Sequence, residues 1–301
     1  MHSGCGNNNA KQAQLRDQGI ELLANGDCDG AIVLFDEALG MSVGKVEALE
    51  IDINYYKAAA MVSANRYEEA IECYNNLIAF DDKNYEAYFL RGSVYAKSGD
   101  VVSMTEDYNR ALTLHRRDYE LYIKIYENLT ALGMSEQGVA YLNTALDLSD
   151  KSPESYFYRG KIYYLLGQND SALEQLNTAM DKDVTEAKLY IAKVYQSTGD
   201  DVAAEQLLLE YASSEDVSSE VLESLGEIEM NSDNYDRAYE YFSAGLNSGD
   251  TDTRQHLLKG QIVALEYLGR FEEAREILNT YIAEYPDDLQ AAEEAIFLST
   301  R

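Results

Sequence analysis

Apolar residues recur at spacings of three and four along most of the chain, and short polar turns separate the apolar stretches. In the segment 85–118, one apolar series ends at Tyr95 and a second begins at Met104, with a polar turn between them. This spacing is the period of an amphipathic α-helix. Gly99 favours the left-handed conformation that ends a helix, and Asp100 is suited to cap the next one. The segment is therefore predicted to form two helices joined by a short turn.

The same pattern repeats with a period of about 34 residues. The segment 119–152 follows without a gap, begins with the same Tyr-Glu, and places Gly133 and Ala145 where its predecessor has Gly99 and Ala111. A fixed period of this size predicts stacked helical hairpins and not one globular core. Eight units fit the template: Gln12–Lys45, Ile51–Asn84, Tyr85–Asp118, Tyr119–Ser152, Pro153–Val184, Thr185–Ser218, Ser219–Asp252 and about Thr253–Asp288.

Three kinds of position recur in these units. The turns carry glycine, asparagine or aspartate at Gly26, Asn65, Gly99, Gly133, Gly167, Gly199, Asp233 and Gly269. The second helix has an early small residue, which a tight helix crossing needs, at Ala31, Ala70, Ala172, Ala204, Ala238 and Ala274. A bulky residue stands four positions further on, at Phe35, Tyr74, Tyr108, Leu142, Leu176, Leu208, Phe242 and Leu278.

These positions resemble the tetratricopeptide repeat, which has an aromatic residue at position 4, glycine or alanine at position 8 and tyrosine at position 11. Matching residues here are Tyr88, Tyr122 and Tyr156 at position 4, Ala58, Gly92, Gly160, Ala192 and Gly226 at position 8, and Tyr95, Tyr163 and Tyr195 at position 11. The match covers about residues 12–288. It departs at position 20, where Met104 and Gly138 replace alanine, and at Lys188, which replaces the aromatic residue of position 4.

The resemblance implies an all-α solenoid, a right-handed superhelix of about eight helix pairs whose first helices line a concave groove. It also implies a non-enzymatic scaffold that binds a peptide or protein segment in that groove. We expect a flexible tether over residues 1–11, the repeat array over 12–288 and a C-terminal capping helix over 289–301. The capping helix is expected because an open-ended stack needs a solvent-facing end.

The charge of the chain restricts its partners. Lys and Arg number 24 against 54 Asp and Glu, which gives a formal net charge of −30. Nucleic acids and anionic lipid surfaces are bound through basic residues, so neither is expected as a partner. Repulsion between such chains favours a monomer. No apolar stretch approaches the ~20 residues that span a bilayer.

The three cysteines do not suggest a disulfide framework. Equivalent helices would hold Cys28 and Cys73 about 9 Å apart along their axes, beyond disulfide reach, so both are expected to be free thiols. Cys5 follows Ser-Gly and precedes a polar Gly/Asn stretch, which resembles a bacterial lipoprotein cleavage site. Lipidation at Cys5 would make this an extracytoplasmic, membrane-anchored protein that organises an envelope complex. However, His2 replaces the usual leucine and the apolar signal stretch is missing, so a cytoplasmic protein with a disordered start is the alternative.

Residues suited to catalysis or metal binding are sparse. The three histidines, His2, His115 and His256, have no spacing typical of a metal site or an activated nucleophile. Residues 25–36 match the spacing of a calcium loop, but the turn and cap of the first repeat explain the same residues. We therefore expect no cofactor and no metal. An enzyme or a carbohydrate-binding surface is the alternative in a different class.

The groove positions of the family are 2, 5, 9, 12 and 13 of each first helix. Carried over to this chain, they include aromatic residues that the framework does not require and lysines that oppose the net charge: Tyr55, Phe89, Phe157 and Tyr164, with Lys97, Lys161 and Lys193. Aromatic anchors with a few charges are typical of a peptide-binding groove, and an ordinary solvated face is the alternative. The glutamate at position 2 of five units, Glu220 among them, is expected to complement the helix dipole.

Overall fold

The computed structural model describes residues 4–42, 46–148, 150–213, 217–248, 253–286 and 288–299. Within these ranges it contains seventeen α-helices and no β-strand. The chain divides into two compact units, Met1–Leu148 and Ser149–Arg301. The predicted all-α solenoid is confirmed, since within the described ranges the helices pack on near neighbours in the chain and form several separate hydrophobic clusters.

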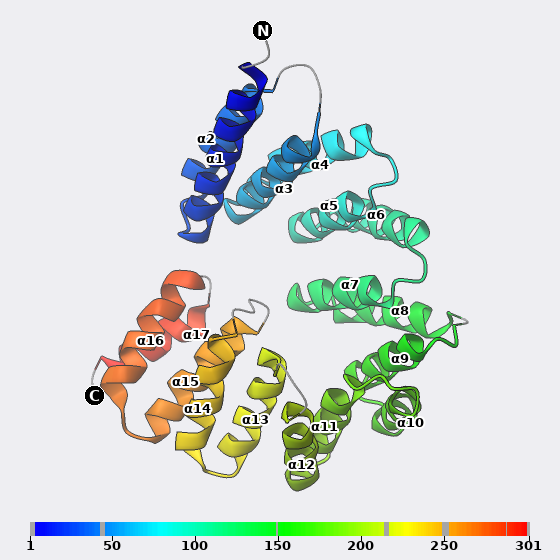
Figure 1. The fold of residues 1–301 in the computed structure, drawn as a ribbon, viewed down its shortest axis with the longest axis vertical. Helices are drawn as coiled ribbons and strands as arrows, with labels where there is room; N and C mark the ends of the chain where they lie inside the picture. Colours follow the sequence, from blue (N-terminus) through cyan, green and yellow to red (C-terminus); the bar gives the residue numbers. More distant parts are fainter. Residues whose placement is uncertain are drawn as a thin grey trace. The chain divides into compact units, whose positions relative to one another are not determined.

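The first unit consists of four helix pairs (Figure 1). They are α1 (Gly4–Ala24) with α2 (Cys28–Gly40), α3 (Ala48–Ser63) with α4 (Tyr67–Phe80), α5 (Tyr85–Ser98) with α6 (Val101–Leu114), and α7 (Tyr119–Ala131) with α8 (Ser135–Leu146). Each helix packs on the next one in the chain, and in addition α1 packs on α3 and α5 on α7. The first helices of the first and second pairs, and those of the third and fourth pairs, therefore lie side by side.

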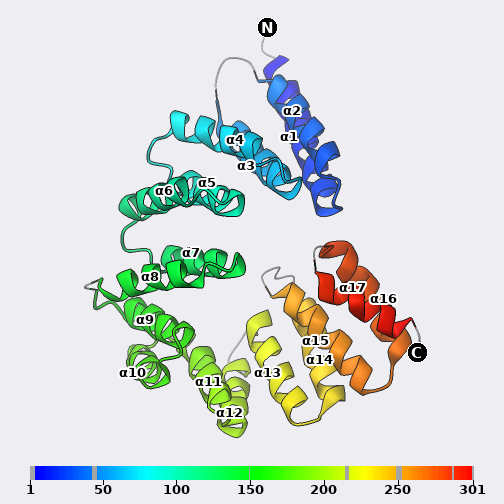
Figure 2. The ribbon, with the colours of Figure 1, turned by 180° about the vertical axis from the view of Figure 1, so that it is seen from behind.

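The second unit has four more pairs and a final single helix (Figure 2). They are α9 (Pro153–Leu165) with α10 (Asn169–Met180), α11 (Ala187–Ser197) with α12 (Asp201–Ala212), α13 (Ser219–Asn231) with α14 (Tyr235–Leu246), α15 (Arg254–Tyr267) with α16 (Phe271–Glu284), and α17 (Leu289–Leu298). Here α9 packs on α11, α11 on α13, and α13 on α15. At the end of the stack α17 packs on α16, in the place predicted for the capping helix.

The turns within the pairs form as the sequence predicts. All eight predicted turn residues have positive φ, between 57° and 82°, including the non-glycine residues Asn65 and Asp233. Three of these turns continue into an aspartate whose carboxylate accepts a hydrogen bond from the first turn of the next helix, at Asp27, Asp100 and Asp200. In these three hairpins the left-handed residue ends one helix and the carboxylate caps the next, so two adjacent residues specify the turn.

A close contact inside two of the pairs explains the small residue of the first helix and the bulky residue of the second. A methyl group added at Gly92 of α5 would lie 2.9 Å from the Tyr108 ring of α6, and one added at Gly160 of α9 would lie 2.5 Å from Leu176. Both bulky residues are fully buried. The small residue of the first helix thus leaves the space into which the bulky residue of the second helix packs. The six predicted crossing alanines of the second helices are fully buried as well.

The structure differs from the prediction near the amino terminus. Helix α1 begins at Gly4, so residues 4–11 belong to this helix, whereas a flexible tether was expected there. Helix α3 begins at Ala48, before the repeat start predicted at Ile51, because Glu47 and Glu50 form a capping box. Capping chemistry outside the repeat pattern therefore sets this boundary.

The burial of two cysteines and the hydrophobicity of the helices can be compared with the sequence. Cys28 is half-buried, Cys73 is buried, and both are free thiols as expected. None of the helices in the described ranges is long and apolar enough to cross a membrane.

Candidate functional site

Four of the predicted groove residues meet in the second unit around Tyr190 of α11. The rings of Phe157 and Tyr164 lie edge-on to the Tyr190 ring, with centroid separations of 5.6 and 6.0 Å. The ammonium groups of Lys161 and Lys193 each lie 5.2 Å from the centroid of the same ring. We call these five residues the Tyr190 cluster.

Helical spacing brings the members of the Tyr190 cluster together. Phe157, Lys161 and Tyr164 follow one another at intervals of four and three on α9, so they share one face of that helix. Tyr190 and Lys193 are three residues apart on α11, and α9 packs directly on α11. Tyr190 itself is only 6% exposed, whereas Phe157 and Tyr164 are half-buried. The buried ring thus holds two partly exposed rings in fixed positions.

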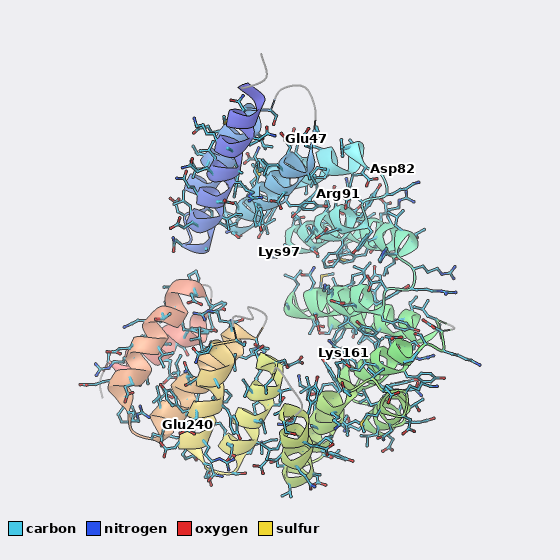
Figure 3. All side chains as sticks on the ribbon, viewed as in Figure 1. Glu47, Asp82, Arg91, Lys97, Lys161 and Glu240 are labelled. Atoms are coloured by element: carbon cyan, nitrogen blue, oxygen red, sulfur yellow. The ribbon has the colours of Figure 1, made fainter. Side chains whose placement is uncertain are left out.

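The two lysines of the Tyr190 cluster differ in their charge environment. Lys193 Nζ lies 2.6 Å from Glu220 Oε1 at the start of α13, and the Tyr190 hydroxyl donates to the same oxygen at 3.2 Å. Glu220 therefore forms an ion pair with Lys193, in addition to lying at the N-terminus of α13 as predicted. Lys161 is labelled in Figure 3. Within the described parts of the chain, it has no carboxylate within ion-pair distance. Lys161 is an uncompensated positive charge in a strongly acidic protein.

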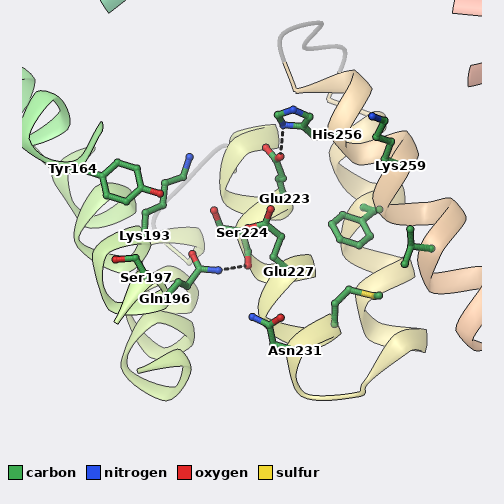
Figure 4. Close-up of a pocket in the computed structure, with 14 residues that line it drawn as sticks. Tyr164, Lys193, Gln196, Ser197, Glu223, Ser224, Glu227, Asn231, His256 and Lys259 are labelled. Atoms are coloured by element: carbon green, nitrogen blue, oxygen red, sulfur yellow. Dashed lines mark hydrogen bonds and ion pairs between the residues drawn. The ribbon is translucent and has the colours of Figure 1, made fainter. Parts of the chain in front are cut away.

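A hollow of about 680 Å³ adjoins the Tyr190 cluster and is lined mainly by α11, α13 and α15 (Figure 4). Tyr164 and Lys193 belong to both the cluster and the lining of the hollow. Met230 of α13 and Val263 of α15 contribute apolar surface to the lining. The cluster and the hollow together form a continuous surface along the first helices of four successive pairs.

Acidic and basic side chains from α13 and α15 face this hollow. His256 Nδ1 of α15 lies 2.9 Å from Glu223 Oε1 of α13, and this contact raises the pKa of the imidazole. Glu227, one turn after Glu223, opens to the hollow. Desolvation by the surrounding protein raises the pKa of its carboxyl group, and the charge of Glu223 raises it further. The lining therefore combines rings, cations and carboxylates, which suits recognition of a polar chain segment.

The other three predicted groove residues lie in the first unit and do not converge. Tyr55 is half-buried and donates a hydrogen bond of 2.9 Å to Asn84, the N-cap of α5, and burial raises the pKa of its phenol to about 12. Phe89 packs against the buried Tyr108 with 5.9 Å between centroids. Lys97 is exposed at the end of α5 (Figure 3). Tyr55 and Phe89 thus make packing contacts between helices, and their part in a groove stays a prediction.

Sequence reasoning did not select Tyr190 or His256 as groove residues. Tyr190 was not singled out because it is not at one of the groove positions of the family. The available signal was its spacing of three from Lys193, which places both on one helical face. His256 was considered only as a catalytic or metal-binding residue, and its contact with Glu223 joins residues on different repeats.

The residues that matched a calcium-loop spacing have other contacts. The Asp27 carboxylate accepts a hydrogen bond of 2.9 Å from the Gly30 amide and caps α2, and Asp36 pairs with Lys57 at 2.6 Å. Among the described residues, no three His, Cys, Asp or Glu side chains are grouped to hold a metal ion.

The backbone of Cys5 lies in the first turn of α1, and its side chain is outside the described residues. Lipidation at Cys5 remains a prediction from the sequence. Metabolic labelling of the full-length precursor with a fatty-acid probe is expected to mark the wild type and to leave Cys5→Ser unlabelled. An unlabelled wild type, or equal labelling of both, would contradict the prediction.

Comparison with known families agrees with the repeated geometry. A family model described as "TPR repeat" matches residues 59–99, and one described as "Tetratricopeptide repeat" matches residues 261–288. The chain is a tetratricopeptide repeat protein. The two matches lie in different units of the structure, so tetratricopeptide repeats occur in both.

Solved structures similar to this tetratricopeptide repeat protein show the same fold. A tetratricopeptide repeat protein from Parabacteroides merdae is 16% identical with a TM-score of 0.51, and the alignment covers 84% of this chain and 99% of that one. The APC/C hetero-tetramer Cut9–Hcn1 is 13% identical with a TM-score of 0.51, and the alignment covers 91% of this chain and 56% of that one. A search of curated proteins gave no match.

Tetratricopeptide repeat proteins are generally non-enzymatic scaffolds, and this fold supports a protein or peptide partner. The side chains around Tyr190 are of the kinds that such binding needs. Rings fixed by packing, an unpaired ammonium and a neighbouring hollow are means of binding a chain segment.

Proposed function

We propose that the second unit binds a segment of a partner protein along the Tyr190 cluster and the adjoining hollow. The observation that carries this proposal is the convergence of Phe157, Lys161, Tyr164 and Lys193 on one buried ring next to a hollow of about 680 Å³. On an ordinary solvated face we would not expect side chains from two helices to converge on one ring.

The residues of the cluster would contribute in different ways. Phe157 and Tyr164 are partly exposed rings that Tyr190 already immobilises, so little side-chain entropy is lost when a partner covers them. Lys161 would attract an acidic side chain or a terminal carboxylate of the partner, because no carboxylate within the described residues neutralises it. Lys193 of α11 would add to this attraction, although its charge is partly neutralised by the ion pair with Glu220.

Reversal of both charges tests the proposal. Random 16-residue peptides are first selected on the wild-type full chain, and the affinity of the enriched peptides is then measured by fluorescence anisotropy. Lys161→Glu combined with Lys193→Glu is expected to weaken binding at least tenfold, since loss of a central contact costs about 1.4 kcal/mol or more. Helicity by circular dichroism should remain unchanged.

Lys151→Glu combined with Lys182→Glu is the matched control. Both lysines are exposed, lie in the second unit and are absent from the Tyr190 cluster and the hollow, so this variant changes the net charge by the same amount. It should bind the selected peptides nearly as the wild type does. Equal weakening in both double variants, or none in either, would refute the proposed groove.

A further inference from the structure

The ion pair between Lys193 and Glu220 occupies donors that a partner of the Tyr190 cluster would use. Lys193 Nζ of α11 lies 2.6 Å from Glu220 Oε1 of α13, and the Tyr190 hydroxyl donates to the same oxygen at 3.2 Å. An ammonium and a hydroxyl thus meet on one carboxylate oxygen. They form a site that fits a carboxylate, and in the free chain one of the protein's own side chains fills it.

Water has access to both members of this ion pair. The side chain of Lys193 is 19% exposed and that of Glu220 is 35% exposed. Ion pairs of partly exposed side chains are weak, because water solvates both charges when they separate. A carboxylate from outside can therefore replace Glu220 at a small cost in free energy.

A second ammonium lies close to the same site. Lys161 and Lys193 each lie 5.2 Å from the centroid of the Tyr190 ring, so their charges are separated by no more than twice this distance. Among the described residues, neither Glu220 nor another carboxylate pairs with Lys161. A carboxylate that enters beside Tyr190 would therefore replace Glu220 at Lys193 and would also be attracted by Lys161.

The opposite side of the hollow is less favourable to an anion. Figure 4 shows Lys193 and Tyr164 on one side of the hollow and Glu223 and Glu227 of α13 across from them. The two glutamates would repel an acidic group that entered near α13. An acidic group of a bound segment is therefore expected beside Tyr190, between α9 and α11.

We infer that Glu220 is an internal competitor for a carboxylate of the bound segment, which displaces it from Lys193 and from the Tyr190 hydroxyl. This inference rests on the proposed function of the second unit. It adds that the recognised group is a carboxylate, from an Asp or Glu side chain or from the C-terminus of the segment. Glu220 lowers the affinity for such a segment, because its ion pair must break before the carboxylate can bind.

The experiment compares Glu220→Gln with the wild type, using the 16-residue peptides selected on the wild-type full chain and fluorescence anisotropy. Glutamine keeps the length of the side chain and an oxygen that can accept from the Tyr190 hydroxyl, but it removes the charge. The selected peptides should bind Glu220→Gln about fivefold more tightly than the wild type, as expected when a weak ion pair no longer has to break.

Matched peptides identify the group that displaces Glu220. In one series Asp and Glu are replaced by Asn and Gln, and in the other the C-terminal carboxylate is amidated. Removal of the displacing carboxylate should abolish the gain, so that this peptide binds Glu220→Gln and the wild type within about twofold of each other. The series in which the gain disappears shows whether a side chain or the C-terminus supplies the carboxylate.

Glu210→Gln is the matched control. Glu210 of α12 pairs with Lys188 of α11 at 2.6 Å and does not line the hollow, so this variant removes the same charge from a similar ion pair. At about 0.15 M salt, charges more than about 8 Å apart are largely screened from each other. The control should therefore bind every peptide nearly as the wild type does.

The outcomes separate this inference from the proposed function. Unchanged or weaker binding of the selected peptides to Glu220→Gln would overturn the inference alone, because Glu220 would then not compete with them. An equal gain in Glu210→Gln, or a gain that persists in both matched series, would also overturn it. If no selected peptide loses affinity for the variant with Lys161→Glu and Lys193→Glu, the proposed function is refuted together with it.

Discussion

Replacement of Tyr108 by alanine is expected to lower the free energy of unfolding by about 3–5 kcal/mol, the range for removing a large buried aromatic side chain. Tyr108 of α6 is fully buried and its ring lies against Gly92 of α5. Its ring also meets Tyr141 of α8 edge-on, at 5.9 Å between centroids. Its hydroxyl accepts a 2.6 Å hydrogen bond from Asn128 of α7. One side chain therefore connects four helices of two successive repeats.

The location of the damage distinguishes this explanation from a general loss of stability. Each repeat contacts only its neighbours, so amide hydrogen exchange in Tyr108→Ala should accelerate mainly in α5–α8 and much less in α13–α16. Denaturant unfolding followed by circular dichroism gives the total change. A loss below 1 kcal/mol, or acceleration spread evenly over both units, would show that Tyr108 does not connect these repeats.

Tyr108→Phe separates the contribution of the hydroxyl from that of the ring. It retains the ring contacts and leaves the Asn128 amide without its acceptor, which should cost about 1–2 kcal/mol. A phenylalanine variant as unstable as the alanine variant would assign most of the effect to the hydrogen bonds and not to packing.

Gly226→Ala is expected to destabilise the second unit by about 1–3 kcal/mol through overpacking. A methyl group on Gly226 of α13 would lie 2.4 Å from Cε1 of Phe242, whose side chain is 2% exposed. The ring cannot move away easily, because a methyl group on Gly260 of α15 would lie only 2.7 Å from its other edge. Phe242 is thus fitted between two glycines on adjacent first helices.

A second substitution should relieve the overpacking. Leucine at Phe242 would recreate the pair of Ala192 with Leu208, which is fully buried at the equivalent positions of α11 and α12. Gly226→Ala with Phe242→Leu should therefore be more stable than the sum of the two single effects, by about 0.5 kcal/mol or more, in thermal or denaturant unfolding.

Gly40→Ala provides the control for the glycine substitution itself. Gly40 ends α2, and a methyl group there would have nothing within 4 Å. Alanine at this helical position should leave stability unchanged or raise it by up to about 1 kcal/mol. If Gly226→Ala proves as harmless as Gly40→Ala, the helix crossing is looser than the structure indicates.

The hairpins could be predicted because each depends on a few adjacent residues. A left-handed residue followed by an aspartate ends one helix and caps the next, as at Gly99 and Asp100, and neither effect needs a distant contact. The prediction was wrong where local chemistry lay outside the repeat, as at the capping box of Glu47 and Glu50.

The candidate site could be predicted only in part. The family positions selected Phe157, Lys161 and Lys193, which do meet in the structure. They also selected Tyr55 and Phe89, whose rings pack between helices of the first unit. Equivalent repeat positions carry no information about which of these side chains meet one another, since that depends on the side chains of the neighbouring repeat.

The sequence by itself determined the class of fold, the helix pairs and their turns, because these follow from hydrophobic period and from residues close together in the chain. Only the tertiary structure decided that Tyr190 is the centre of the cluster and that, among the described residues, Lys161 has no carboxylate partner. Both facts depend on contacts across helices, such as the ion pair of Lys193 on α11 with Glu220 on α13. The charge left over after such pairing is a property of the packed array, and no residue type or spacing in the chain specifies it.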